Sequence, residues 1–252
     1  MKIIDMNVTI GAKDSKGNFV TPNSLLEMMK NYNIDRVVAY HALAKFEHGS
    51  GNALMSKIAK ESGEKIGMCA VLDPVLEEKS LEGTGTLSQR LRACGAEAVR
   101  IFPSELRVAF HPFYLGNIFD SANELGLPLI IDEDFAHSST VPEIFYHLPD
   151  IAKLYPKIKF IITRYGICNS RHIIPLATKL ENVYFTVDKM LDHMQIEEIC
   201  EKGAENKLLF SCCYPETTPA GALGLTLYAN ITDAQKKKIL SENWEEIRYV
   251  NK

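Results

Sequence analysis

Eight short apolar runs recur along the chain and predict β-strands. Most of them lack a regular alternation of apolar and polar residues, which is typical of strands buried on both faces. Their starts are separated by roughly 24 to 34 residues, which is enough for a strand, a helix and two connections, so we expect βα units in series. The predicted strands are Lys2–Met6, Arg36–Tyr40, Lys65–Val71, Ala98–Ile101, Pro128–Ile131, Lys159–Ile162, Val183–Thr186 and Leu208–Phe210.

Amphipathic helices are predicted between these strands. The first has Thr21 as its N-cap and Pro22 in its first turn, and its apolar face is expected to hold Leu25, Leu26 and Met29.

Later helices have their own start and stop signals. A second helix is expected to begin at Asn52, and a further one to end at Gly126. Pro142 and Pro149 predict one short and one longer helical piece before Tyr155. The capping box Thr232-x-x-Gln235 predicts a terminal helix.

Eight βα repeats are best accommodated by a (β/α)8 barrel, and we expect residues 1–252 to form one such domain. In this fold the chemistry lies at the carboxyl ends of the strands. A doubly wound open sheet is the alternative. It is less favoured because the residues after the first strand, Asn7 to Gly11, do not form the G-x-G-x-x-G phosphate loop of that fold.

Composition and net charge limit the kinds of partner that we expect for this chain. The chain has 252 residues, 46% hydrophobic and 24% charged, with a net charge of −4 and a pI near 6.0. Nucleic acids and anionic membranes need a basic surface, so neither is expected as a partner. No apolar run approaches the roughly 18 residues of a membrane span. The first residues do not form a signal peptide and the six cysteines follow no zinc or disulfide spacing, so we expect reduced thiols and a cytoplasmic location.

Polar residues follow almost every predicted strand. Arg164 is the least expected of them, because it closes the apolar run Phe160-Ile161-Ile162. A guanidinium keeps its charge inside a protein, so a partly buried one needs an anion beside it. The other residues at strand ends are Asn7, Thr9, His41, Asp73, Arg100, Asp132, Glu133, Asp134, Asp188, Cys212 and Cys213.

The segments around these strand ends resemble amidohydrolase family 2, the metal-dependent hydrolases similar to aminocarboxymuconate-semialdehyde decarboxylase. The phrases that carry the resemblance are IIDMNVTIG, GAEAVRIFP, ELGLPLIID, YPKIKFIITRYG, NVYFTV, KLLFSCCYP and ILSENWEEI. Their common order implies the amidohydrolase-type (β/α)8 barrel over nearly the whole chain. The family would also imply zinc or another divalent metal as cofactor.

The metal ligands that the resemblance implies are replaced in this chain. The family's first strand ends in His-x-His, where this chain has Asn7 and Thr9. Ligand histidines of the fifth and sixth strands correspond to Asp132 and Arg164, and the catalytic aspartate of the eighth corresponds to Cys213. We therefore expect no metal cofactor, with Arg164 supplying one positive charge in place of a cation and Asp132 as its partner. A rearranged zinc site of Cys213, Asp132 and His41 is the alternative.

These residues favour a metal-independent hydrolase or lyase that acts on a small carboxylate, a possibility that metal-free relatives such as the pyrone-dicarboxylate lactonases permit. The candidate substrate-binding residues are Asn7, Arg100 and Arg164. The candidate catalytic residues are His41 or Asp132 as acid or base and Cys213 as nucleophile. The alternatives are a non-catalytic binding barrel and a metal-dependent hydrolase with a rearranged ligand set. By analogy with related barrels, a homodimer is possible.

Each candidate also has a purely structural interpretation. Arg164 and Asp132 could be an ion pair that only plugs the barrel. Cys212 and Cys213 could be small buried apolar residues, and His41 a hydrogen-bonded structural histidine. His137, in the loop after Asp132, is the one further histidine expected to reach the barrel mouth.

Overall fold

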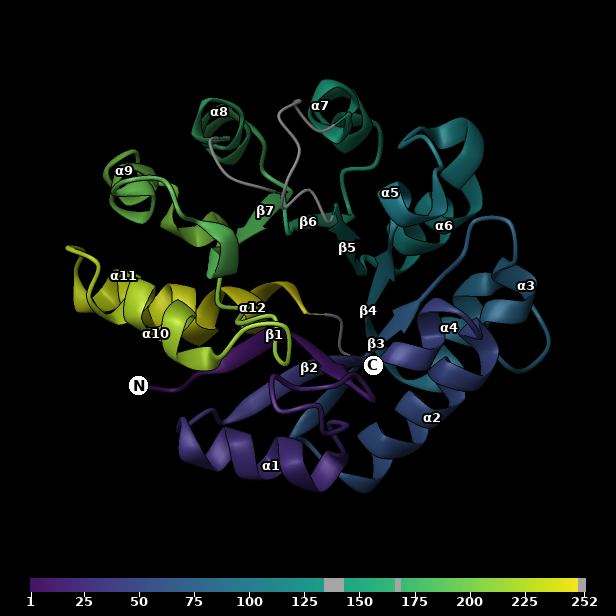
Figure 1. The fold of residues 1–252 in the computed structure, drawn as a ribbon. Coiled ribbons are helices and arrows are strands. Elements are labelled where there is room, and N and C mark those ends of the chain that lie inside the picture. Colours follow the sequence, from purple (N-terminus) through teal and green to yellow (C-terminus); the bar gives the residue numbers. More distant parts are fainter. Residues whose placement is uncertain (134–142, 166–168, 249–252) are drawn as a thin grey trace.

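The computed structural model describes residues 1–133, 143–165 and 169–248 of the chain, and the side chains of residues 77 and 78 are not described. Eight parallel strands form one sheet in the order β1 to β8, surrounded by helices (Figure 1). The strands are β1 Ile4–Ile10, β2 Arg36–His41, β3 Ile66–Val71, β4 Ala96–Ile101, β5 Pro128–Asp132, β6 Lys159–Thr163, β7 Val183–Thr186 and β8 Leu208–Leu209. All eight predicted strands are present, so the predicted (β/α)8 fold is confirmed.

The sheet curls into a nearly closed barrel (Figure 1). β8 is only two residues long, and the contact between β8 and β1 is made by the chain that follows it. The backbone N–H of Met6 donates to the carbonyl of Phe210 at 3.2 Å, and that of Thr9 donates to the carbonyl of Tyr214 at 2.8 Å. The first strand is thereby fixed beside the loop that follows the last.

Helices cover the outside of the barrel. The α-helices are α1 Pro22–Asn31, α2 His48–Glu61, α3 Glu77–Ser80, α4 Leu87–Cys94, α5 Pro103–Leu106, α6 Pro112–Leu125, α7 Ile144–Leu154, α8 Ser170–Lys179, α9 Gln195–Glu201, α10 Pro219–Leu227, α11 Asp233–Lys237 and α12 Asn243–Ile247. Short single-turn helices are η1 Ala42–Lys45, η2 Val187–Lys189 and η3 Glu205–Lys207, and η4 Lys238–Glu242 is a π-helical turn. None of the described helices is long and apolar enough to cross a membrane.

Thr21 and Thr232 cap their helices as predicted, but three helix predictions were wrong. Leu26, expected on the apolar face of α1, is exposed, and Met28 is buried instead. α2 begins at His48, four residues before Asn52. α7 continues through Pro149, where a break was predicted, because its apolar residues stay buried on both sides of the proline. Pro142 lies outside the described residues.

Two layers of apolar side chains position the site. One fills the barrel interior and includes Val38 and Tyr40 of β2, whereas Val37 and Ala39 pack between the sheet and the helices. This alternation follows from the two-residue period of a strand. In β1 a register shift between Asp5 and Val8 interrupts it, and Asn7 then faces the barrel interior. Bulges of this kind often re-aim side chains near functional sites.

Candidate functional site

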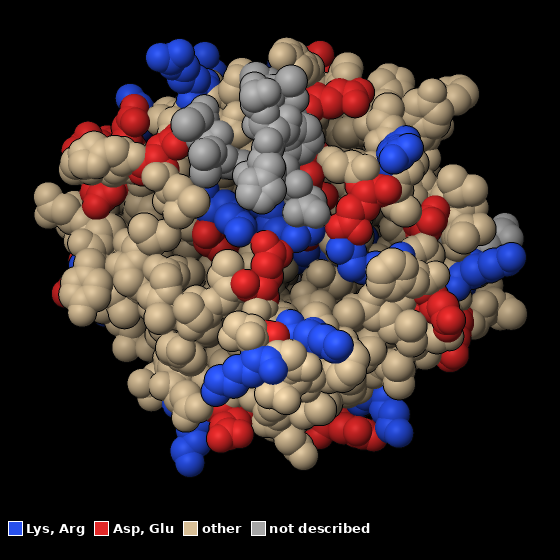
Figure 2. Space-filling model, viewed as in Figure 1, with Lys and Arg blue, Asp and Glu red and all other residues tan. Residues whose placement is uncertain are grey.

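A cavity of about 290 Å³ opens at the carboxyl ends of the strands. Its lining includes Asn7, Tyr40, Asp132, Arg164 and Cys213. The cavity thus brings together two of the three candidate catalytic residues and two of the three candidate binding residues. Basic and acidic side chains lie next to one another near the centre of the face shown in Figure 2.

Arg100 is buried below this cavity. It lies on β4 between Ala98 and Phe102, whose side chains fill the barrel interior. Its guanidinium lies over the ring of Tyr40 at 4.7 Å, an arrangement that favours a cation. Nη2 donates to Oδ1 of Asn7 at 2.6 Å and Nη1 donates to Oδ2 of Asp132 at 2.6 Å. Arg100 is therefore held by protein groups rather than directed into the cavity.

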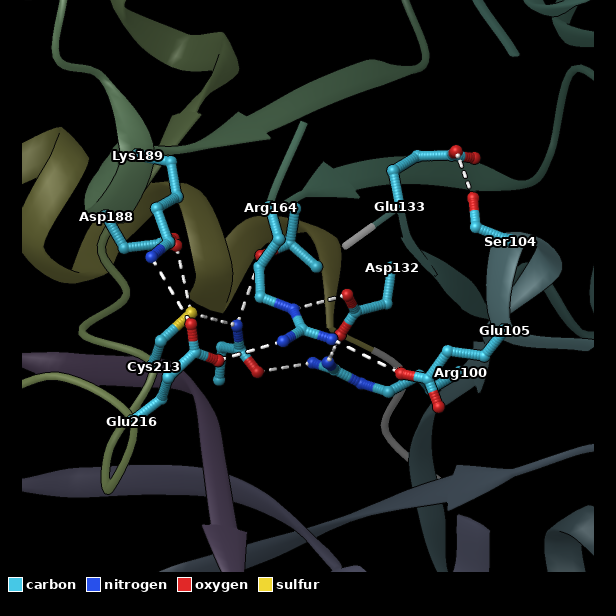
Figure 3. A network of polar contacts seen from close by, with 12 residues as sticks. Arg100, Ser104, Glu105, Asp132, Glu133, Arg164, Asp188, Lys189, Cys213 and Glu216 are labelled. Carbon is cyan, nitrogen blue, oxygen red and sulfur yellow. Dashed lines mark hydrogen bonds and ion pairs between the residues drawn. The ribbon is translucent and has the colours of Figure 1, made fainter. Parts of the chain in front are cut away.

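Asp132 ends β5 and accepts hydrogen bonds from two guanidinium groups (Figure 3). Oδ1 accepts from Nε of Arg164 at 2.6 Å, while Oδ2 binds Arg100. The predicted pairing of Asp132 with Arg164 is confirmed, and Arg100 adds a second cation that the sequence did not indicate. Because Asp132 is 1% exposed, both interactions act in a poorly screened environment.

Arg164 is directed over the mouth by its backbone. It follows β6 and has a φ of +51°, in the left-handed region that non-glycine residues rarely adopt. In a continued strand, Arg164 would share the outward orientation of Ile162, which packs between sheet and helices. The left-handed turn instead places the guanidinium inside the mouth, and such conformations are concentrated at functional sites.

Two glutamates from neighbouring segments also contact Arg164 (Figure 3). Nη1 donates to Oε2 of Glu216 at 2.8 Å, and Nη2 lies 3.5 Å from Oε1 of Glu105. Each glutamate also contacts a lysine: Glu105 binds Lys45 at 2.5 Å and Glu216 lies 3.4 Å from Lys189. Arg164 is thus the centre of a branched network of opposite charges.

Cys213 is a buried thiol beside the cavity. Its Sγ donates to Oδ2 of Asp188 at 2.9 Å and accepts from Nδ2 of Asn7 at 2.9 Å. Burial, and then the charge of Asp188, raise the pKa of Cys213 well above its usual value. The residue is therefore a thiol rather than a thiolate at neutral pH, which does not favour nucleophilic attack.

A second thiol and carboxylate lie next to this pair. Sγ of Cys212 donates to Oδ2 of Asp5 at 2.5 Å. Asp5 is fully buried, and this burial raises its pKa to about 7. Burial likewise raises the pKa of Glu133, which accepts from Ser104 at 2.9 Å, to about 7. Asp134 and His137 lie outside the described residues.

His41 does not line the cavity. It follows Tyr40 on β2, so the strand period directs its side chain away from the barrel interior. Its ring packs against Gly11, where an added Cβ would lie 2.6 Å from the imidazole, and Nδ1 accepts from the backbone of Leu43 at 3.2 Å. The structure places His41 in a capping position, and its catalytic role stays an untested prediction.

The donors around Asp132 do not fit a divalent metal. Within residues 1–133, 143–165 and 169–248, no three or more histidine, cysteine, aspartate or glutamate side chains converge as a ligand set. Both oxygens of Asp132 face guanidinium nitrogens, and the thiol of Cys213 is directed to Asp188. The three groups of the alternative zinc site, Cys213, Asp132 and His41, therefore do not meet.

Several residues of the site were not predicted from the sequence. Lys45, Glu105, Lys189 and Glu216 lie in loops or single turns, where no periodicity indicates a direction. Tyr40 had a usable signal, because the alternation of β2 places it inside the barrel with Val38.

No protein-family model and no curated protein matches this chain. Solved structures do. A protein from Staphylococcus aureus that is described as a putative amidohydrolase has a TM-score of 0.74 at 14% identity, over 98% of this chain and 99% of that chain. The 5-carboxyvanillate decarboxylase from Sphingomonas paucimobilis has a TM-score of 0.73 at 12% identity, over 98% of both chains. A probable 2-pyrone-4,6-dicarboxylic acid hydrolase from Acinetobacter baumannii, with citric acid bound, has a TM-score of 0.70 at 16% identity, over 98% and 99%.

Matches at this level of identity concern the fold, and they extend over nearly all of each chain. The fold that these structures share with this chain is the one that the sequence phrases, in their common order, implied. The chain thus has the (β/α)8 fold of the amidohydrolase-type barrels.

Proposed function

We propose that this protein binds a small carboxylate at its barrel mouth without a divalent metal, and acts on it as a hydrolase or lyase. The observation that carries the proposal is the position of Asp132 between two guanidinium groups at the carboxyl ends of the strands. The resemblance places metal ligands at Asp132 and Arg164. In this chain those positions hold a fixed cation and its counter-ion instead.

The electrostatics of the mouth support a metal-free site. A divalent cation next to Asp132 would have to displace both guanidinium groups, and Arg100 has no route to solvent because it is 1% exposed. At short range the like charges would repel strongly in such a buried environment. No step of the proposed chemistry therefore uses a metal.

The cavity itself supports an anionic ligand. Its lining includes Arg164, Lys45 and Lys13, as well as the neutral hydrogen-bonding groups of Asn7 and Tyr40. A planar guanidinium suits a planar carboxylate, and lysine adds charge without fixed geometry. The cavity volume of about 290 Å³ matches the lower end of small-molecule sites.

For the chemical step, we assign proton transfer to Cys213 rather than nucleophilic attack. Its raised pKa keeps the proton on sulfur, and Asp188 accepts a hydrogen bond from that thiol. Such a thiol can give its proton only to a more basic group in the cavity, such as a carbanion or an alkoxide, and the thiolate that remains then takes a proton from water. Asp132 holds the two arginines in place, because each of its oxygens accepts a hydrogen bond from one of them.

One observation favours a second candidate, a non-catalytic binding barrel. The guanidinium of Arg164 already contacts three protein carboxylates, those of Asp132, Glu105 and Glu216. A network closed in this way would also be expected if the charges only stabilised the barrel.

Thermal unfolding with a small ligand set tests the proposal. Benzoate, succinate and citrate should raise the Tm, whereas neutral benzamide should not. A ligand at a hundredfold excess over its Kd stabilises the folded state by about 2.7 kcal/mol, which is easily measured as a Tm shift. The shift should vanish in Arg164→Ala and shrink in Arg164→Lys, which keeps the charge but loses the planar fork.

Two outcomes would refute the proposed function. Benzamide could stabilise the protein as well as benzoate does, or the benzoate shift could survive Arg164→Ala unchanged. If carboxylates bind but none of a panel of esters, lactones and aromatic carboxylates is converted, the binding barrel is the correct reading. A Cys213→Ser variant that turns over such a substrate at the wild-type rate would rule out the proton-transfer assignment.

A further inference from the structure

Glu216 differs from the other carboxylates around Arg164 in how it is held. It lies in the loop after β8 and is directed back over the mouth toward Arg164 and Lys189 (Figure 3). One oxygen accepts from Arg164 at 2.8 Å, and the other lies 3.4 Å from Nζ of Lys189. A single carboxylate group therefore spans two cations from the ends of β6 and β7.

The exposure of Glu216 makes it the displaceable partner. Its side chain is 47% exposed, whereas that of Asp132 is 1% exposed and bound on both oxygens. An ion pair in which one partner is this exposed is partly screened by water and contributes less than a pair with both partners buried. Although burial raises it, the charges of Arg164 and Lys189 lower the pKa of Glu216 from its usual value, so the carboxylate is charged at neutral pH.

Glu216 also lines the cavity, together with Arg164, Asn7 and Cys213. A carboxylate bound by Arg164 and Lys189 would lie on the same side of the mouth as the thiol of Cys213 (Figure 3). The geometry of the loop thus places a protein carboxylate where the proposed function needs a ligand carboxylate.

We propose that Arg164, which lines the cavity, and Lys189, which lies beside it, form a carboxylate-binding subsite at the edge of the cavity, and that Glu216 occupies the subsite until a ligand carboxylate displaces it. This inference rests on the proposed function, since it names where the small carboxylate binds. A ligand that must displace Glu216 binds more weakly by the fraction of molecules in which the subsite is open. Glu216 then sets the affinity threshold of the site and favours ligands whose carboxylate binds both cations at once.

Calorimetric titration of the protein with benzoate tests this arrangement. Glu216→Gln should lower the Kd for benzoate roughly three- to tenfold, because the competing charge is removed. Lys189→Gln should raise the Kd in both the wild-type and the Glu216→Gln background, because the subsite then has one cation. Glu47→Gln is the matched control: it removes the same charge from an exposed residue that does not line the cavity, and should leave the Kd unchanged.

Each result is decisive. If Glu216→Gln and the wild type bind benzoate equally, the subsite is elsewhere in the cavity and the proposed function stands without it. If Glu47→Gln tightens binding as much as Glu216→Gln, the effect is long-range charge and the inference is wrong. If no variant binds benzoate, succinate or citrate, the proposed function fails as well.

Discussion

Asp132 is almost fully buried and neutralises two arginines, so its substitution tests the charge network directly. Asp132→Asn should lower the free energy of unfolding by about 3–5 kcal/mol, since it leaves Arg100 buried without a counter-ion. Urea unfolding measures this loss. Glu216→Gln is the control and should cost less than about 1 kcal/mol, because Glu216 is half exposed and Arg164 keeps Asp132 as its counter-ion. Equal losses for the two variants would mean that burial does not govern these interactions.

Asp5 gives the protein a predictable pH dependence. Burial raises its pKa from 3.8 to about 7, so between those pH values the folded state binds more protons than the unfolded chain. The contribution of Asp5 to the free energy of unfolding is therefore fully present below about pH 4 and falls as the pH rises to about 7, by an amount on the order of a few kcal/mol.

Asp5→Asn removes this titration and keeps the side-chain shape. The wild type should lose stability relative to Asp5→Asn between pH 5 and pH 8, and urea unfolding at several pH values measures the difference. A constant difference across that range would show that Asp5 does not titrate in the folded protein as described.

Whether the position of a site residue could be predicted depends on whether a strand or a loop sets the direction of its side chain. Asp132 and Arg164 follow neighbouring parallel strands, so their pairing could be inferred from strand order. His41 was predicted at the mouth because it is a polar residue at the end of its strand, but the two-residue period that turns Val38 and Tyr40 inward directs His41 away from the interior. Glu216 could not be inferred at all, since its direction depends on a loop.

At the scale of elements, the strands were predictable because each is a short apolar run between helices. The register shift in β1 was not, although it turns Asn7 toward Arg100. A bulge adds a residue to one strand relative to its neighbour, and the pattern of apolar residues in the sequence does not show where that residue is added. α7 continues through Pro149 for a similar reason, because packing of the helix outweighs the local signal.

A close approach within β3 gives a prediction at this scale. Gly67 faces the ion pair of Arg36 and Glu97, and an added Cβ would lie 2.7 Å from Nη2 of Arg36 and 2.8 Å from Oε1 of Glu97. Gly67→Ala should therefore displace the ends of these two side chains and lower the Tm, with a loss of about 1 kcal/mol, because flexible side-chain ends can shift.

The control is Gly116 in α6, where an added Cβ meets nothing within 4 Å. Gly116→Ala should stabilise the helix by about 0.5–1 kcal/mol and raise the Tm. Two variants that both raise the Tm would contradict the close packing described around Gly67.

At the scale of the whole molecule, the barrel brings together residues at or just after six strands that are far apart in sequence. Fold and strand order could be predicted from the repeat alone, and the solved structures similar to this chain agree. The chemistry could not, because it depends on which side chains the loops add to the mouth. The homodimer and the cytoplasmic location stay predictions.

The central claim is that arginine, not a divalent metal, provides the cation that binds a carboxylate at the mouth. The most direct measurement is calorimetric titration of the protein with benzoate before and after exhaustive treatment with a metal chelator. The account predicts the same Kd in both titrations, with no effect of added zinc on the treated protein. Binding that is lost on chelation and restored by zinc would contradict it.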